Sequence, residues 1–237
     1  MPLPTIEVPK YKLKIPSSGK MVTYRPFLVK EEKILLTALE TNNSEEGLTQ
    51  ALINLIDSCI TTKGIKVESL PPFDLEYMFL QLRAKSVGET VEINVKCDNK
   101  DCVHSSFDSE IDISNLKIEK NKEHTNKIEL SDELGIVMKY PKMKDSYGLD
   151  IKNTNDIFDI ILKCIDSIYT KEEVFPSKDH TKEELLSFVE QLSPEYFRKI
   201  IKFFETMPTM DSDIECVCPH CNEKTVIELR GIDDFFI

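Results

Sequence analysis

Cys216-Val217-Cys218-Pro219-His220-Cys221, near the end of this 237-residue chain, is one of two short cysteine clusters. The other is Cys97-Asp98-Asn99-Lys100-Asp101-Cys102, near the middle. Both lie between segments in which apolar residues alternate with polar ones, a pattern typical of β-strands. Cysteine pairs with two to four intervening residues are typical ligands of structural zinc. The spacing therefore predicts one zinc ion held by Cys97, Cys102, Cys218 and Cys221, which would join two hairpins that are distant in sequence.

Three further side chains could take part in this site. Cys216 either replaces Cys218 as a ligand or lies beside the site along the strand. His104 and His220 are alternative donors, although a histidine next to a cysteine turn is more often a solvated neighbour. A site of four thiolates leaves no position for water, so the predicted zinc is structural rather than catalytic.

The composition limits the partners and the compartment. The chain has 30 Lys and Arg against 42 Asp and Glu, a formal net charge of −12. This balance argues against nucleic acid as a partner, because phosphate attraction requires a basic surface. No segment has the roughly 20 apolar residues of a membrane span. We expect a cytoplasmic location, where thiols stay reduced and clustered cysteines are better read as metal ligands than as disulfides.

The periodicity of apolar residues predicts an α+β fold, a mixed helical protein with a discontinuous zinc-ribbon-like β module. We expect a β-hairpin and helices in residues 1–85, the β module in residues 86–141 completed by 212–237, and a helical segment at 142–211 packed alongside. A second hairpin is expected at Ile128–Leu130 and Ile136–Tyr140.

The predicted helices are marked by stripes and caps. Helices are expected at 28–40, around the stripe from Leu48 to Ile60, and after Asp74 as a cap. A further helix carries apolar residues from Ile157 to Ile168, and two more follow the capping box Thr181-x2-Glu184 and the cap Ser193-Pro194. Cys59 and Cys164 lie on apolar stripes of such helices and are expected to be core residues.

Signals for catalysis are weak. The chain lacks a GxGxxG, P-loop, HExxH or GxSxG motif, and we expect no enzymatic activity and no small-molecule substrate. Paired acids such as Glu31-Glu32 fall in the first turns of helices, where they favour the helix dipole, and we expect them on a solvated face. Asp233-Asp234 precedes Phe235, Phe236 and Ile237, which either pack on the protein's own core or dock on another subunit.

Two stretches carry a resemblance to a known family. They are Arg25-Pro26-Phe27-Leu28-Val29-Lys30-Glu31-Glu32-Lys33 with the following residues to Leu36, and the segment FLQLRAKSVGE at 79–89. The sequence resembles the baseplate hub assembly proteins of T4-like contractile-tailed phages over most of its length. The resemblance implies a baseplate protein without known catalytic activity, whose partners are other phage tail and baseplate hub proteins. It also implies the host cytoplasm during assembly as a location, and it leaves open whether the protein stays in the virion tail baseplate.

Two other classes stay open on the residues alone. An intracellular zinc-ribbon regulator or transcription adaptor would share the cysteine turns but would normally show a basic face. A thiol oxidoreductase would use Cys218 and Cys221 as a redox pair, although such a pair usually opens a helix, whereas a strand is expected after Cys221.

Overall fold

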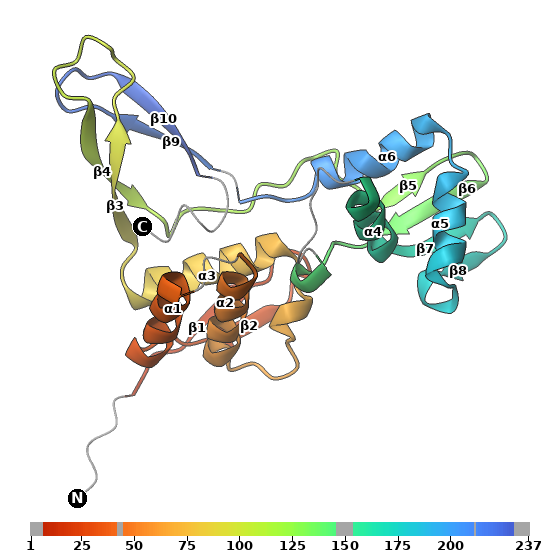
Figure 1. The fold of residues 1–237 in the computed structure, drawn as a ribbon. Coiled ribbons are helices and arrows are strands. Elements are labelled where there is room, and N and C mark those ends of the chain that lie inside the picture. Colours follow the sequence, from red (N-terminus) through yellow and green to blue (C-terminus); the bar gives the residue numbers. More distant parts are fainter. Residues whose placement is uncertain (1–6, 42–44, 146–153, 211, 230–237) are drawn as a thin grey trace, which may run out of the picture. The chain divides into compact units, whose positions relative to one another are not determined.

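The computed structural model describes residues 7–41, 45–145, 154–210 and 212–229. The chain divides into two compact units. Unit 1 comprises Met1–Val67, Phe73–Glu119 and Thr209–Ile237, and unit 2 comprises Glu68–Pro72 and Lys120–Pro208. Both units combine helices with small antiparallel sheets (Figure 1), so the fold is α+β as the periodicity predicts. No helix within the described ranges is long and apolar enough to cross a membrane.

The first part of unit 1 is a hairpin followed by three helices. Its elements are β1 (Tyr11–Lys14), β2 (Met21–Tyr24), α1 (Val29–Thr41), α2 (Glu45–Cys59) and α3 (Pro72–Ser86). The short 3-10 helix η1 (Val67–Ser69) begins at the last residue of this stretch and continues into residues 68–72, which are assigned to unit 2. The two strands pair antiparallel, as predicted, with Leu13 opposite Val22, and both of these side chains are buried. The hairpin is joined to α2 by a bridge between Tyr24 and Ile60.

Asp74 does not have the capping role expected of it. Helix α3 begins at Pro72, so Asp74 lies in the first turn and is fully buried. Its carboxylate accepts hydrogen bonds from the backbone N–H and the hydroxyl of Ser17. The acid therefore ties the β1–β2 turn to α3, because a buried carboxylate needs hydrogen-bond donors.

The second part of unit 1 consists of two hairpins from distant parts of the chain. They are β3 (Thr90–Lys96) with β4 (Ser106–Asp112), and β9 (Ser212–Val217) with β10 (Lys224–Leu229), each pair antiparallel. Figure 1 shows the two hairpins side by side, and one apolar cluster contains residues of both, among them Val95, Phe107 and Cys216. A second cluster brings Leu80 and Ala84 of α3 against the base of the hairpins.

Unit 2 is a four-stranded antiparallel sheet with helices. The strand order is β5-β6-β7-β8. Its elements are β5 (Lys127–Glu129), β6 (Leu134–Met138), the 3-10 helices η2 (Met143–Asp145) and η3 (Ser177–Asp179), α4 (Thr154–Cys164), β7 (Ile165–Thr170), β8 (Val174–Pro176), α5 (Lys182–Glu190) and α6 (Pro194–Glu205). Side chains from the sheet and all three α-helices share one apolar core, which includes Ile136, Ile161, Val189 and Ile200.

Two sequence-based expectations differ from this architecture. The helix predicted to reach Ile168 ends at Cys164, and the chain continues directly as β7, which pairs with β6. The sequence pattern also assigns residues 86–141 to one β module, whereas β5 and β6 belong to the sheet of unit 2. The expected hairpin between these two strands is present.

The predicted caps of α5 and α6 are confirmed. The Thr181 hydroxyl accepts from the Glu184 N–H, and the Glu184 carboxylate accepts from the Thr181 N–H. The Ser193 hydroxyl accepts from the Tyr196 N–H, with Pro194 at the first helical position. Each cap satisfies backbone donors that the helix itself cannot.

Candidate metal centre

The first cysteine turn is closed by its own backbone and by one asparagine. The Cys97 N–H donates to the Ser105 carbonyl (3.0 Å), which ends the β3–β4 pairing at the turn. The Asn99 carbonyl accepts from the Cys102 N–H (3.1 Å), and the Asn99 side chain accepts from the Asp101 N–H (2.9 Å). An asparagine that bonds the backbone two residues on is a common turn former. These bonds bring Cys97 and Cys102 to the same side of the turn.

The second turn is tighter. The Cys218 N–H donates to the Glu223 carbonyl (2.8 Å), and the Asn222 N–H donates to the Cys218 carbonyl (2.9 Å). Asn222 has a φ of 59°, in the left-handed region that asparagine tolerates better than most residues. The left-handed residue reverses the chain directly after Cys221 and starts β10.

The structure brings the four predicted sulfur atoms together. The Sγ atoms of Cys97, Cys102, Cys218 and Cys221 all lie within 4.8 Å of one another, and the Cys97 and Cys221 sulfurs are 3.6 Å apart. All four thiols are free. A tetrahedral zinc site with Zn–S bonds of about 2.3 Å places its sulfurs about 3.8 Å apart. The observed separations, 3.6 Å for one pair and at most 4.8 Å for the others, are close to those around a single tetrahedral ion.

The surroundings hold the two turns against each other. Cys97 and Cys218 are buried, and Cys102 and Cys221 are half-buried. The Asp98 N–H donates to the Thr225 hydroxyl of β10 (3.4 Å), a hydrogen bond between the two hairpins. Nothing in the sequence marked Thr225, because its role depends on the register between hairpins.

The thiols differ in acidity. Burial raises the pKa of the Cys97 thiol to about 12. Burial also opposes ionisation of Cys218, but the backbone N–H groups of His220 and Cys221 donate to its sulfur, and its pKa falls to about 7. Peptide N–H groups aimed at a sulfur stabilise the thiolate, which is the form that binds metal.

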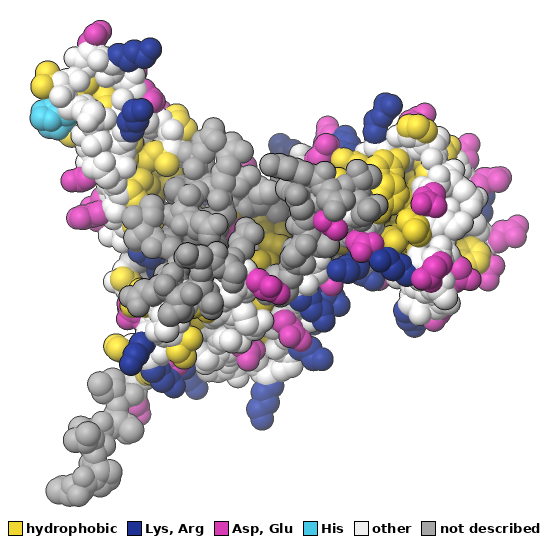
Figure 2. Space-filling model, viewed as in Figure 1, with side chains coloured by type: hydrophobic (Ala, Val, Ile, Leu, Met, Phe, Trp, Pro, Cys, Tyr) yellow, Lys and Arg dark blue, Asp and Glu magenta, His cyan; other side chains and the backbone are white. Residues whose placement is uncertain are grey.

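The other candidate donors lie outside this group of four. Cys216 is buried in β9 opposite Thr225 and packs with Val95 and Phe107. The imidazoles of His104 and His220 stack on each other, with ring centroids 3.7 Å apart. Histidine side chains are visible at the outer end of the paired hairpins (Figure 2). Among the described residues, the sulfur cluster is complete without these three side chains.

The remaining cysteines are core residues, as expected. Cys59 and Cys164 have no exposed surface. Burial raises the pKa of both thiols, to about 12 for Cys164. Neutral buried thiols behave as small apolar side chains.

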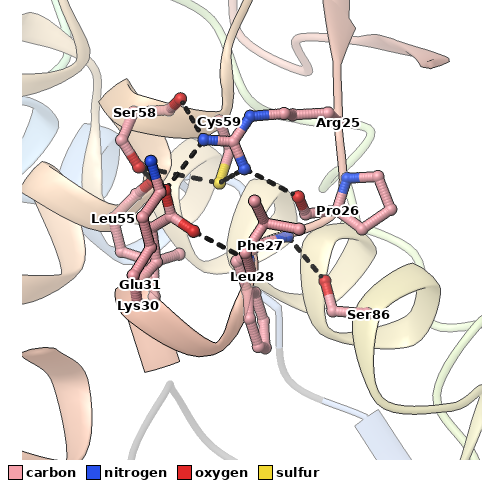
Figure 3. Close-up of polar contacts among 10 residues, drawn as sticks. All are labelled: Arg25, Pro26, Phe27, Leu28, Lys30, Glu31, Leu55, Ser58, Cys59 and Ser86. Carbon is pink, nitrogen blue, oxygen red and sulfur yellow. Dashed lines mark hydrogen bonds and ion pairs between the residues drawn. The ribbon is translucent and has the colours of Figure 1, made fainter. Parts of the chain in front are cut away.

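The stretch from Arg25 to Leu36 forms the entry to α1 and its first two turns. Glu31 is buried here rather than on a solvated face, because Arg25 and the Leu28 N–H bind its carboxylate. The Arg25 guanidinium bonds the Glu31 carboxylate (2.8 Å), the Ser58 carbonyl (3.1 Å) and the Pro26 carbonyl (2.9 Å), as Figure 3 shows. The Phe27 N–H donates to the Ser86 hydroxyl (2.9 Å), which ties this entry to the end of α3. The other candidate contact, Phe235, Phe236 and Ile237, lies outside the described residues.

A family of phage proteins matches nearly the whole chain. The model of the family described as T4 bacteriophage base plate protein matches residues 8–237. The chain therefore belongs to this family of phage baseplate proteins.

One curated relative matches the chain almost from end to end. The chain is 24% identical over 227 residues to the baseplate hub assembly protein gp26 of Enterobacteria phage T4. The alignment covers 96% of this chain and 98% of that protein. No solved structure matches the chain.

Proposed function

We propose that this protein is a non-catalytic assembly or structural component of the phage tail baseplate hub, which acts by contacting other baseplate proteins. Its family and its likeness along nearly the whole chain to a baseplate hub assembly protein support this role. The protein would act in the host cytoplasm while the tail is built, and the virion tail baseplate is its second expected location.

We further propose that one zinc ion is held by Cys97, Cys102, Cys218 and Cys221. The observation that carries this proposal is the convergence of four free sulfurs from two distant hairpins within 4.8 Å. Thiolate donors favour zinc over the hard cations that prefer oxygen. Four protein ligands close the coordination sphere, so the ion would stabilise the paired hairpins rather than activate water.

Two alternative functions fit less well. A redox pair at Cys218 and Cys221 would normally open a helix, whereas here β10 follows. A zinc-ribbon adaptor for nucleic acid needs a basic surface. On the face shown in Figure 2, Lys and Arg side chains are interspersed with Asp and Glu.

Metal analysis and one matched pair of variants test the zinc proposal. Purified protein should contain one equivalent of zinc. Cys221→Ser should lose that zinc and melt at a much lower temperature, because structural zinc in peptides contributes about 10–16 kcal/mol near neutral pH. Cys216→Ala is the control, since its thiol lies in the same hairpin but outside the sulfur cluster, and it should keep one equivalent. Wild-type protein with far less than one equivalent and all thiols free would refute the site.

A truncation tests the assembly role. Removal of Phe235, Phe236 and Ile237 takes away three large apolar side chains, each worth about 1.5–3 kcal/mol when buried. We expect the truncated protein to fold and bind zinc but to enter hub or baseplate intermediates less efficiently. If the truncated protein unfolds, these three residues belong to the core. If it folds and assembles normally, they are not a docking site, and the Arg25–Leu36 region becomes the next surface to test.

A further inference from the structure

Helix α1 presents a face that the described residues of the protein leave largely exposed. Val29 is 79% exposed and Leu36 is 52% exposed, and Glu32 and Lys33 lie between them. These four residues are spaced i, i+3, i+4 and i+7, so they form one stripe along the helix. We call the set of Val29, Glu32, Lys33 and Leu36 the α1 stripe. No ion pair within the described part of the chain engages Glu32 or Lys33.

The opposite face of α1 is fixed inward. Glu31 is buried, and its carboxylate accepts from Arg25 and from the Leu28 N–H (both 2.8 Å), as drawn in Figure 3. Leu35 is buried as well, four residues further along. The helix cannot turn about its axis to hide the α1 stripe without breaking the Arg25–Glu31 pair. Within the described part of the chain, the α1 stripe therefore stays on the surface of the folded protein.

The order of residues in the α1 stripe is self-complementary. Reading along the helix gives an apolar residue, an acid, a base and an apolar residue. In an antiparallel pair of α1 helices related by a two-fold axis, Val29 of one copy faces Leu36 of the other, and Glu32 faces Lys33. A parallel pair would instead place Glu32 against Glu32 and Lys33 against Lys33, which is unfavourable.

We propose that the α1 stripe binds the same stripe of a second copy of this chain, with the two helices antiparallel. The two-fold arrangement uses one surface twice and closes on itself, as isologous dimers do. It pairs the half-buried Glu32 and the exposed Lys33 of each copy with side chains of opposite charge, and it covers the exposed Val29 and Leu36. This inference is independent of the zinc site and goes beyond the proposed baseplate role.

The size of the surface sets the strength of the pairing. Stable specific interfaces bury about 1,200 Å² or more in total. A contact centred on four residues per copy is smaller than that, so the dimer is weak and depends on protein concentration. It is also sensitive to salt, because its two ion pairs are at the surface.

Charge reversal tests the arrangement in the purified full-length protein. Sedimentation velocity over a concentration series up to about 1 mM should show a reversible monomer–dimer equilibrium for the wild type. Glu32→Lys alone and Lys33→Glu alone each replace two attractive pairs by two repulsive ones. Each should raise the dissociation constant by a factor of about ten or more.

The decisive measurement mixes the two variants. A Glu32→Lys chain paired antiparallel with a Lys33→Glu chain again has opposite charges at both positions, so the mixture should dimerise about as well as the wild type. A variant that failed to fold could not be rescued in this way. Lys171→Glu, an exposed reversal in unit 2, should leave the equilibrium unchanged.

Three results would overturn the inference: a wild type that stays monomeric throughout the series, reversals without effect, or a mixture that stays monomeric. None of these results bears on incorporation into hub intermediates, which is measured with the other baseplate proteins present. Failure of the dimer and failure of the baseplate role are therefore distinguishable.

Discussion

Glu31 is a buried acid of unit 1 whose replacement should lower the stability of the protein measurably. Its side chain is 5% exposed, and its carboxylate meets Arg25 at 2.8 Å, Lys30 at 3.3 Å and the Leu28 N–H at 2.8 Å. Burial opposes ionisation, but these partners outweigh it and lower the pKa of Glu31 from 4.5 to about 2. Glu31→Gln keeps the shape of the side chain and removes its charge.

The pKa of Glu31 gives the size of the expected effect. One pKa unit corresponds to about 1.4 kcal/mol, so the fall from 4.5 to about 2 corresponds to about 3 kcal/mol of stability. Because the folded-state pKa is the lower one, this stabilisation is present above pH 4.5 and is lost as the pH falls toward 2. Glu31→Gln should therefore lower the free energy of unfolding by about 2–3 kcal/mol at neutral pH, since the amide can still accept a hydrogen bond.

Urea denaturation at two pH values checks this reasoning. The deficit of Glu31→Gln relative to wild type should shrink by about half when the pH is lowered from neutral to about 3. Glu32→Gln, one residue along the same helix and without a described ion partner, is the matched control and should change stability by less than about 0.5 kcal/mol. A Glu31→Gln variant as stable as the control at neutral pH, or a deficit that does not depend on pH, would refute the argument.

Two further predictions concern unit 2. A Cβ at Gly135 would overlap the ring of Tyr169, its partner on β7, with Cε1 only 2.6 Å away. Gly135→Ala should cost about 1–3 kcal/mol in urea denaturation, and Tyr169→Val should relieve most of that cost in the double variant. His124 bonds Tyr140 (2.9 Å) and Thr206 (3.0 Å), and burial lowers its pKa below 6.5. The protein should lose stability as the pH falls below about 6.5, and His124→Gln should lose less over the same range; equal slopes would contradict this role.

Local signals in the sequence were sufficient to predict features that depend only on neighbouring residues, such as helix caps and hairpin turns. The caps at Thr181 and Ser193 follow from orphan N–H groups at helix starts, and both are present. The hairpin of β1 and β2 follows from alternation around a turn. Each cysteine turn presents its two thiols to one side, which is a local property, whereas the meeting of the two turns depends on contacts between the hairpins.

The junction of α4 and β7 shows where local signals fail. The apolar residues up to Ile168 fit a helical stripe, yet the helix ends at Cys164. In β7 the inward side chains are Ile165 and Ser167, and the buried serine hides the strand alternation. Pairing of β7 with β6 decides the outcome, and that pairing spans the whole of α4. Tertiary contacts of this kind override helix propensity and cannot be read from a short window.

The role of Cys216 follows from the same distinction between strand and turn. Cys216 and Cys218 are two residues apart, so alternation alone would place them on one face. Cys218 lies beyond the end of β9, in the turn, whereas Cys216 remains in the strand opposite Thr225. The turn redirects Cys218 toward Cys221, and Cys216 stays in the apolar layer beneath the sulfurs. Cys218 rather than Cys216 therefore joins the sulfur cluster because β9 ends at Val217.

The path of the chain gives the cysteine cluster its structural meaning. The chain leaves unit 1 after Glu119, forms most of unit 2, and returns to unit 1 at Thr209. At this crossing the Glu119 N–H donates to the Thr209 carbonyl (3.0 Å) and the Thr209 N–H donates to the Glu119 carbonyl (3.4 Å), so the two chain segments are paired where they meet. The β3–β4 hairpin precedes the inserted unit and the β9–β10 hairpin follows it, and the sulfur cluster joins their turns. Closing a long loop costs entropy. A metal ion at the cysteines would offset part of this cost, because it would join two hairpins that come from opposite sides of the insertion.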